Sequence, residues 1–278
     1  MYVSNTFGTI SLGADPEIFV VNKDGTPWGA IHTGITGTKE NPQVVPKGAV
    51  QIDGLALEFN IDPAFSLEEW ETNLATVAVN ITKTAQKKGY KTVQASMLDF
   101  TQYIDTAKPT EDELLFGCDP DFNADTMQEN TMPDNDGSIK FRTTGGHVHI
   151  GMTNWQALCM DDDRIAHAMA QQIIFVCDGV LGLWSVLNDD GLERKKLYGK
   201  AGAYRIKPYG VEYRTMSNFW IFDPELRADV FTTVTHFMAD SDNWQRAVSI
   251  ATAYRNEIVE AINTNDRDAA AHLLAKFY

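Results

Sequence analysis

The sequence predicts an α+β fold in which mainly antiparallel strands carry polar motifs and helices pack on them. The N-terminal third alternates apolar and polar residues as strands do, the middle holds a long apolar helical stretch, and the last part of the chain is a series of helical patterns. The 278 residues, 44% of them hydrophobic, are enough to bury a sizeable core. We expect one domain over 1–278, with its strands from about 10 to 220 and a helical part from about 224 to 278.

Strands come first along the chain. They are expected in "SLGADPEIFVV" (11–21) and in "AVQIDGLALEFNI" (49–61), where Asp53-Gly54 is a strong hairpin signal. A helix follows, because Ser66 and Glu69 form a capping box, apolar residues recur at helical spacing and Gly89 closes the pattern. "KTVQASM" (91–97) then predicts another strand.

The second half alternates polar, strand and helical stretches. Residues 105–140 are polar and rich in turn residues, which predicts a long loop that acts as a lid, with disorder as the competing explanation. A strand in 139–152 and a helix over roughly 162–187 follow, and 202–216 predicts two strands joined through Pro208-Tyr209-Gly210. Three helices are expected in 224–240, 242–263 and 266–278.

Composition narrows the class of protein. The net charge of −15 argues against a nucleic-acid surface, which needs a basic patch. No stretch reaches ~18 consecutive apolar residues, since Asp178 interrupts the longest one, and the start lacks the basic and apolar stretches of a secretory signal. Cys118, Cys159 and Cys177 fit no metal or disulfide pattern. We therefore expect a cytoplasmic protein with free thiols, bound to neither membrane nor nucleic acid.

Four predicted strands carry charged or imidazole side chains, three of them as pairs two residues apart. Such pairs share one face of a strand. Carboxylates packed closely repel one another unless cations neutralise them, and oxygen ligands with imidazole suit Mg²⁺ or Mn²⁺. An arginine beside them suits phosphate or carboxylate. The residues concerned are Asp15 and Glu17, Asp53 and Glu58, His147 and His149, and Glu212 and Arg214.

Each motif also has a plain structural interpretation. Asp15 and Glu17 fit a solvated strand end, and Asp53 fits an Asp-Gly turn at least as well as a metal site. Glu58 fits the polar face of an alternating strand, and Glu212 and Arg214 fit neighbouring exposed charges. The two histidines between glycines are harder to explain in this way. The joint occurrence of four such motifs is what indicates a site.

The same motifs, in the same order, resemble those of the glutamine synthetase-like superfamily. "GADPEIF", "LALEFN", "GGHVHIG" and "GVEYRTMSN" are similar to its four ligand-bearing strands. The length, "HVHIG" and "VEYRTMSNFW" are most similar to phage-associated carboxylate–amine (COOH–NH2) ligases of type 2. The resemblance spans about residues 10–220 and implies an antiparallel half-barrel with helices outside, an amidoligase domain. ATP would enter one end, with two divalent metals between its phosphates and the second substrate.

The resemblance also implies roles for individual residues. Glu17 and Glu58 would share one metal, and Asp15, His147 and Glu212 the other. His149 would touch the nucleotide, Arg214 would hold the transferred phosphoryl group or the substrate carboxylate, and Arg205 and Lys207 would bind phosphate. Asp53 lies closer to Glu58 than the superfamily's further acid does, so its role as metal ligand or turn residue stays open.

The sequence therefore predicts an ATP-dependent ligase that forms an amide or peptide bond through an acyl phosphate, with Glu17 and Arg214 as catalytic residues. Its partners would be small-molecule or peptide acids and amines, in the host cytoplasm if a phage encodes it, and a homo-oligomer stays open. Loops that close over glutamate and ammonia are not recognisable, so glutamine synthesis itself is not expected. The alternatives are an iron oxygenase with two histidines and one carboxylate, and a non-enzymatic binding or virion protein.

Overall fold

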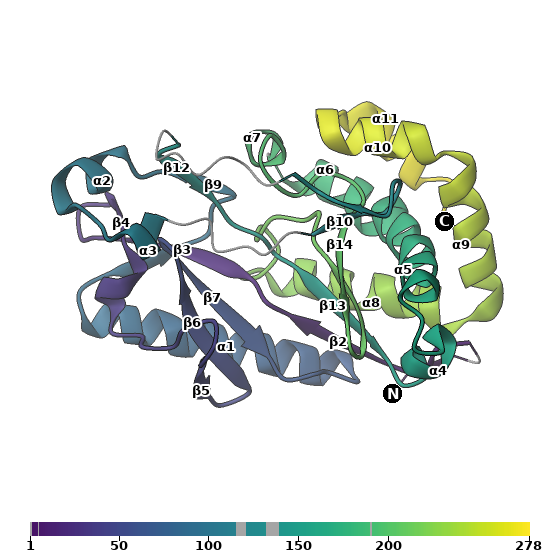
Figure 1. The fold of residues 1–278 in the computed structure, drawn as a ribbon, viewed down its shortest axis with the longest axis horizontal. Helices are drawn as coiled ribbons and strands as arrows, with labels where there is room; N and C mark the ends of the chain where they lie inside the picture. The colour runs from purple at the N-terminus through teal and green to yellow at the C-terminus, as the bar shows by residue number, and fades with distance from the viewer. Residues whose placement is uncertain (1, 5, 115–120, 132–138, 190) are drawn as a thin grey trace.

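Two antiparallel sheets, joined by one continuous strand path, organise the protein (Figure 1). The computed structural model describes residues 2–4, 6–114, 121–131, 139–189 and 191–278. The C-terminal helices gather at the end of the molecule opposite helix α2, Thr101–Ala107 (Figure 1). The sheets curl strongly into a half-barrel, which confirms the predicted α+β class and half-barrel architecture.

The larger sheet has seven strands in the order β1-β2-β13-β15-β14-β10-β11, and its paired strands are antiparallel. Several neighbouring strands in this sheet are not consecutive in the sequence, as with β2 and β13, so distant parts of the chain meet there. The strands are β1 Tyr2–Ser4, β2 Gly8–Ala14, β10 Phe122–Asn123, β11 Gln128–Glu129, β13 Val148–Met152, β14 Ala203–Lys207 and β15 Gly210–Tyr213.

The smaller sheet has the order β4-β3-β7-β6-β5, with β8 also paired to β3. The Asp53-Gly54 hairpin between β6 and β7 is confirmed, and Gly54 adopts a positive φ of 54° in its turn. A separate pair joins β9 to β12. These strands are β3 Glu17–Val21, β4 Pro27–Trp28, β5 Gln43–Val45, β6 Gly48–Asp53, β7 Ala56–Ile61, β8 Lys91–Val93, β9 Met97–Asp99 and β12 Phe141–Thr143.

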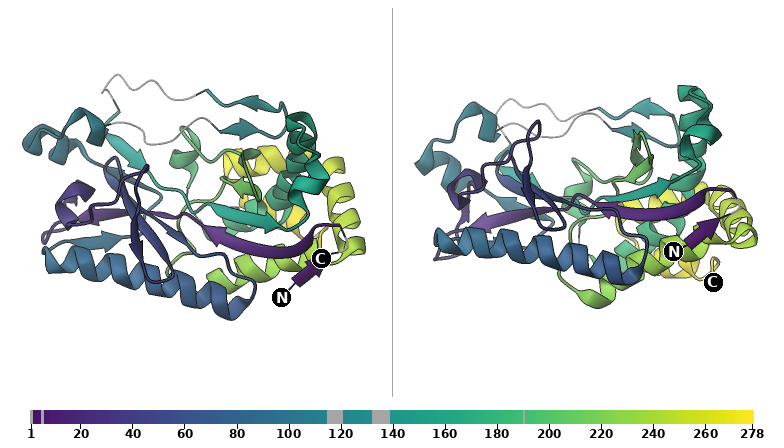
Figure 2. Two further views of the ribbon diagram at one scale, coloured as in Figure 1. Left: turned by 60° about the horizontal axis from the view of Figure 1, so that its bottom comes forward. Right: turned by 90° about the horizontal axis from the view of Figure 1, so that it is seen from below.

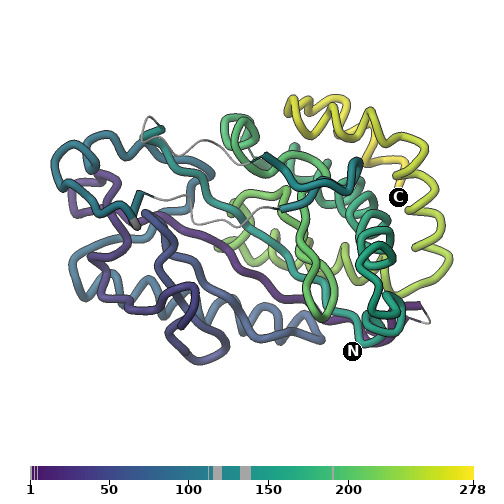
Figure 3. The backbone as a smooth tube through the Cα atoms, in the orientation of Figure 1, coloured from purple at the N-terminus to yellow at the C-terminus, as the bar shows by residue number. Residues whose placement is uncertain are grey.

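The predicted strand 11–21 is two strands, because the chain leaves one sheet and enters the other at Asp15-Pro16. Proline lacks the N–H that a central ladder position needs, so the pairing breaks there. The tube in Figure 3 shows this path running from one half of the molecule to the other. Backbone hydrogen bonds between Leu12 and Ala64 join the two sheets beside it. The Asp-Pro-Glu motif therefore lies where the sheets meet.

Helix α1, Leu67–Lys87, runs beneath the smaller sheet (Figure 2). Its capping box is present: the Glu69 N–H donates to the Ser66 side chain, and the Glu69 carboxylate accepts from the Phe65 N–H. Its apolar face buries Trp70, Leu74 and Val77 as predicted. The next helical elements are η1 Ala30–Thr33, α2, α3 Glu111–Leu114 and α4 Trp155–Cys159.

The long apolar helix predicted near 162–187 contains a π-helical turn. Helix α5, Asp163–Cys177, continues through η2, Asp178–Gly182, into α6, Leu183–Asn188. The stretch Asp163–Asn188 has the length and composition to cross a membrane, and most of its apolar window is buried within the protein. Within the described residues it is the one helix of this kind.

Short helices and aspartate caps shape the C-terminal part. After α7, Leu192–Lys195, the last helices are α8 Pro224–Ala239, α9 Ser241–Ala253, α10 Arg255–Thr264 and α11 Arg267–Leu274. Asp223, Asp240 and Asp266 cap α8, α9 and α11 with their side chains. The single helix predicted over 242–263 is wrong, because the chain turns at Tyr254 between α9 and α10.

The stretch 105–140 is more ordered than the predicted loop in its described parts. It includes the end of α2, helix α3 and the β10–β11 hairpin, which pairs with β14. Residues 115–120 and 132–138 lie outside the described residues, so the lid stays a prediction. Strand 91–97 is likewise split into β8 and the start of β9.

Buried hydrophobic residues form one main cluster and a small second one. The main cluster runs from Phe7 to Phe277 and unites strands with C-terminal helices, and the second surrounds Phe19 and Phe100. The single-domain expectation stays a prediction. Cys159 and Cys177 are free and buried, and Cys118 lies outside the described residues.

Candidate active site

Strand register collects the charged residues of the larger sheet into one row. His149 on β13 lies directly opposite Glu212 on β15, and Glu212 lies opposite Arg205 on β14. Asp15 follows β2 immediately, and its backbone N–H donates to the carbonyl of His147. Because paired residues point to the same face of a sheet, these side chains converge on the concave side.

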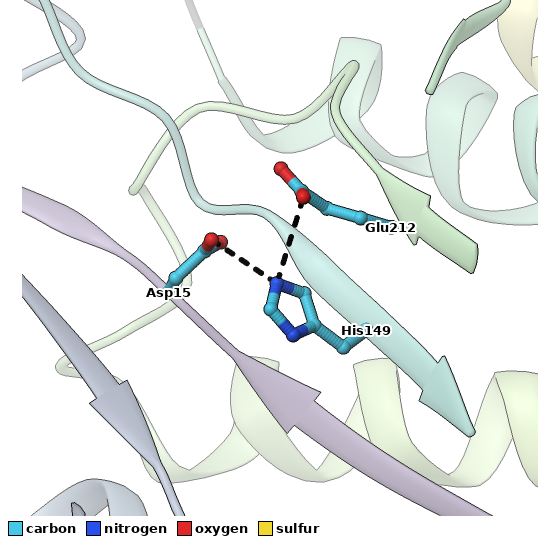
Figure 4. A group of neighbouring side chains, drawn as sticks. All are labelled: Asp15, His149 and Glu212. Carbon is cyan, nitrogen blue, oxygen red and sulfur yellow. Dashed lines mark ion pairs between the residues drawn. The ribbon is translucent and has the colours of Figure 1, made fainter. Parts of the chain in front are cut away.

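The first cluster consists of Asp15, His149 and Glu212 (Figure 4). One ligand atom from each lies within 4.8 Å of the others. His149 Nε2 is 3.1 Å from Asp15 Oδ2 and 3.9 Å from Glu212 Oε2. The other ring nitrogen, Nδ1, lies 2.8 Å from the Tyr209 hydroxyl. Three ligand atoms therefore face one point, with the imidazole held from behind.

His147 contacts the same two carboxylates. Its Nδ1 is 3.2 Å from Asp15 and 3.6 Å from Glu212, and the Arg214 guanidinium donates to it at 3.3 Å. Burial, with the charge of Arg214, lowers the pKa of His147 to about 4. The ring is therefore neutral at pH 7, which is the form that binds a metal. Both histidines contact Asp15 and Glu212, and the predicted division of their roles stays a prediction.

The second cluster consists of Glu17, Asp53 and Glu58, again with ligand atoms within 4.8 Å of one another. Glu17 on β3 lies directly opposite Glu58 on β7. The Gly145 N–H donates to Glu17 at 2.7 Å, and Gln51 Nε2 donates to Glu58 at 3.1 Å. Asp53 ends β6 and joins this cluster, so its turn position and a ligand role are compatible. The structure thus separates Asp15 from Glu17, as the resemblance implied.

The three carboxyl groups of the second cluster resist ionisation when no cation is bound. Burial, with the charge of Asp53, raises the pKa of Glu17 to about 7. Burial and the neighbouring acids raise the pKa of Glu58 well above its usual range, and burial raises that of Asp53. Grouped carboxyls that resist ionisation are what a divalent cation would stabilise.

The atoms of the first cluster also fit a cation. Among the described residues, Asp15 Oδ1, His149 Nε2 and Glu212 Oε2 are buried atoms that make no well-formed hydrogen bond, although ion-pair contacts surround them. Burying such atoms is costly unless something satisfies them. A divalent metal would do so for all three at once. The donor sets of both clusters, oxygen with at most one or two imidazoles, suit Mg²⁺ or Mn²⁺.

Basic residues border the clusters, and their phosphate-binding role stays a prediction. Lys207 Nζ is 2.6 Å from Glu212, and Arg205 Nη1 is 3.8 Å from it. Arg214 contacts Glu212 and donates from Nε to Asp121 at 3.0 Å. The arginine and both acids are buried, and the surrounding cations, Arg214 first, lower the pKa of Glu212 to about 2 against the effects of burial and Asp15. The row therefore combines ionised carboxylates with fixed positive charge.

Most of the predicted site residues line one cavity of about 150 Å³. Lys39 and Gln51 complete its lining. Neither was predicted: Gln51 lies two residues before Asp53 but is uncharged, and Lys39 belongs to none of the four strand motifs. His149 and Glu212 lie beside this lining. The cavity is lined by Asp15, Glu17, Lys39, Gln51, Asp53, Glu58, His147, Arg205, Lys207 and Arg214.

Further cavities adjoin this one on two sides. A cavity of about 440 Å³ shares Lys207 with it and combines apolar residues, among them Trp155, Ile206 and Pro208, with the three acids of 161–163. A narrow cavity of about 40 Å³ shares Glu17, Asp53, His147 and Arg214 and adds Asp121, Arg142 and Arg194. That cavity in turn shares Asp121, Tyr198 and Gly199 with an outer one of about 230 Å³. Asp121 was missed although it ends an Asp-Pro-Asp sequence with the same spacing as Asp15-Pro16-Glu17, because the stretch around it indicated a loop. Tyr209 was missed because a tyrosine in a turn carries no spacing signal.

Comparison with known proteins gives one family. No curated protein matches the chain. The family model described as phage phiEco32-like COOH.NH2 ligase-type 2 matches residues 124–277, more than half of the chain. The match includes both histidines and the β14–β15 hairpin, and excludes Asp15, Glu17, Asp53 and Glu58. By this match and the arrangement of its site, the chain belongs to the phage phiEco32-like carboxylate–amine ligase type 2 family.

Proposed function

We propose that this ligase is ATP-dependent and joins a carboxylate to an amine through an acyl phosphate, with two divalent metal ions. The observation that carries the proposal is the pair of ligand clusters bordering one cavity together with Arg205, Lys207 and Arg214. Asp15, His149 and Glu212, with His147, would hold one ion, and Glu17, Asp53 and Glu58 the other. Bound there, the ions would neutralise phosphate charge.

The chemistry has two steps. A substrate carboxylate oxygen attacks the γ-phosphorus of ATP, the bond to the ADP oxygen breaks, and an acyl phosphate forms. An amine nitrogen then attacks the acyl carbon, the carbon–oxygen bond to phosphate breaks, and the nitrogen loses a proton. Arg214 lies between the two clusters and would hold the transferred phosphoryl group, since its planar guanidinium suits phosphate oxygens.

The adjoining cavities suggest where each substrate lies. The cavity beside Lys207 has the volume of a small-ligand pocket. Its apolar wall from Trp155 and Pro208 would suit a base, and its acids, 161–163, would accept hydrogen bonds from ribose hydroxyls rather than bind phosphate. Lys207 would then stand between the nucleoside and its phosphates. The nucleotide would reach the clusters from this side.

The carboxylate would arrive from the other side, through the outer cavity and past Tyr198. The inner cavity beside Arg142 and Arg194 holds only about 40 Å³, so a slender group such as a terminal carboxylate on an extended chain fits it. Asp121 lines both cavities. As an acid among arginines, it would suit the approaching amine substrate. This arrangement favours small-molecule or peptide substrates.

The iron-oxygenase alternative uses His147, His149 and Glu212, which do lie together. It gives no purpose to the second cluster of three acids. Metal analysis of protein purified without chelator separates the two: one equivalent of tightly bound iron supports the oxygenase, and weak binding of Mg²⁺ or Mn²⁺ supports the ligase.

Calorimetry tests the proposal directly. A non-hydrolysable ATP analogue titrated into the protein should bind in Mg²⁺ and not in EDTA. Glu17→Gln should weaken this binding and abolish ADP formation with a panel of carboxylic acids and hydroxylamine, while Glu193→Gln, a change in an exposed ion pair with Lys196, should do neither. Absence of Mg²⁺-dependent binding by the natural chain would contradict the proposed nucleotide site.

A further inference from the structure

Asp178 is a fully buried carboxylate behind the candidate active site, in the middle of the most apolar helical stretch of the chain. It begins the π-helical turn η2, and such turns are frequent at functional sites. Taking a carboxylate out of water costs several kcal/mol unless hydrogen bonds and an opposite charge compensate it. An apolar residue would pack there without this cost, so the contacts of Asp178 need an explanation.

Four donors surround the Asp178 carboxylate. Oδ1 accepts from the Tyr213 hydroxyl at 2.8 Å and lies 3.2 Å from the Thr215 hydroxyl, whose single proton is shared with the Lys200 carbonyl at 3.1 Å. Oδ2 accepts from the Gly202 N–H at 2.7 Å and from Arg255 Nη1 at 2.8 Å. Both oxygens are therefore satisfied, and three of the four donors belong to the β14–β15 hairpin or its flanks.

The donors alternate with site residues along the chain. Tyr213 and Thr215 lie on either side of Arg214, so their side chains point away from the face that Glu212 and Arg214 share. Gly202 immediately precedes β14, which carries Arg205 and Lys207. The Asp178 carboxylate thus binds the end of β15 and the start of β14 on the side of the sheet opposite the candidate site.

Arg255 fixes the orientation of the carboxylate. Its Nη1 binds Asp178, its Nε and Nη2 bind Asp125 at 2.6 and 2.7 Å, and its guanidinium lies 4.1 Å from the centre of the Phe175 ring. Arg255 belongs to the C-terminal helices, and Asp125 to the turn between β10 and β11. The carboxylate therefore connects these helices to the hairpin that carries four site residues.

We propose that Asp178 is a positioning residue for the ligase site: through Tyr213, Thr215 and Gly202 it sets the β14–β15 hairpin so that Glu212 faces Asp15 and His149. The inference rests on the proposed metal and nucleotide site. A positioning role differs from a purely structural one in what it predicts. Removing the hydroxyl of Tyr213 or Thr215 should lower the affinity for metal and nucleotide even where the protein stays folded.

The test uses variants that remove one donor and keep the carboxylate. Tyr213→Phe deletes the 2.8 Å hydrogen bond to Asp178, and Thr215→Val deletes the hydroxyl that Asp178 and the Lys200 carbonyl share. Both are milder than Asp178→Asn, whose amide would face the Gly202 N–H and Arg255. Tyr204→Phe is the matched control. Tyr204 is buried, lies directly opposite Tyr213 in the sheet, and places its hydroxyl 2.6 Å from His167 instead.

Full-length proteins are titrated with Mn²⁺ and a non-hydrolysable ATP analogue at a temperature well below unfolding, and their Tm values are measured in parallel. We expect the Kd of Mn²⁺ and analogue to rise about tenfold in Tyr213→Phe, and further when Tyr213→Phe and Thr215→Val are combined. Tyr204→Phe should leave both Kd values unchanged. Equal affinity in the natural chain and every variant, whatever their Tm, overturns the inference and leaves the proposed function standing. No binding by the natural chain overturns the nucleotide site, and the inference with it.

Discussion

Replacing Glu17 by glutamine should stabilise the metal-free protein at alkaline pH while it weakens the response to metal. The Glu17 carboxyl is buried and lies within 4.8 Å of Asp53 and Glu58 through its ligand atoms. Glutamine has nearly the same shape, still accepts from the Gly145 N–H through Oε1, and can donate its amide hydrogens to the two remaining acids. The change therefore removes one charge and keeps the packing.

The size of the effect follows from the pKa of Glu17. Its value of about 7 in the folded protein, against 4.5 for an unperturbed glutamate, means that the folded state holds its proton more tightly than the unfolded state. The unfolding free energy therefore falls as the pH rises through that window. Complete ionisation of Glu17 lowers the unfolding free energy by about 3 kcal/mol, and about 2–3 kcal/mol of this loss develops between pH 5 and pH 8.

Urea unfolding in EDTA at pH 5 and pH 8 measures this difference. Glu17→Gln should shift the urea midpoint upward by about 1 M at pH 8 and far less at pH 5. Saturating Mn²⁺ should raise the midpoint of the natural chain more than that of the variant, because the variant keeps only the first cluster intact. Equal pH dependence of the two proteins, or a lower midpoint for the variant at pH 8 in EDTA, would refute the reasoning.

Three further changes test separate parts of the structure. Lys207→Met removes the cation 2.6 Å from Glu212 and should raise the Kd of an ATP analogue about tenfold by calorimetry, whereas Lys23→Met at an exposed position should not. Gly145→Ala places a methyl group against the buried His147 ring, so Mn²⁺ affinity should fall and overpacking should lower the Tm by a few degrees; unchanged affinity would mean that the ring moves freely. Ser66→Ala deletes the cap of α1 and should cost about 1 kcal/mol in urea unfolding, with analogue binding as in the natural chain.

The sequence by itself determined the local elements and the motif residues. The capping box of α1, the Asp53-Gly54 hairpin and the strands around His149 and Glu212 depend on neighbouring residues, so periodicity and turn chemistry were sufficient to predict them. Local signals failed where a tertiary contact decided the outcome. The β10–β11 hairpin forms by adding to β14, which lies about 80 positions further along the chain, and its polar sequence alone indicated a loop.

Only the tertiary structure decided how the motif residues are grouped. The break at Asp15-Pro16 sends Asp15 to one cluster and Glu17 to the other, although the two are separated by one residue. Asp53 joins Glu17 because β6, β7 and β3 are neighbours in the smaller sheet. The role of Asp178 is invisible in a sequence that shows only an interrupted apolar helix. Cross-strand register between distant segments sets these distances, and register depends on the packing of the whole core.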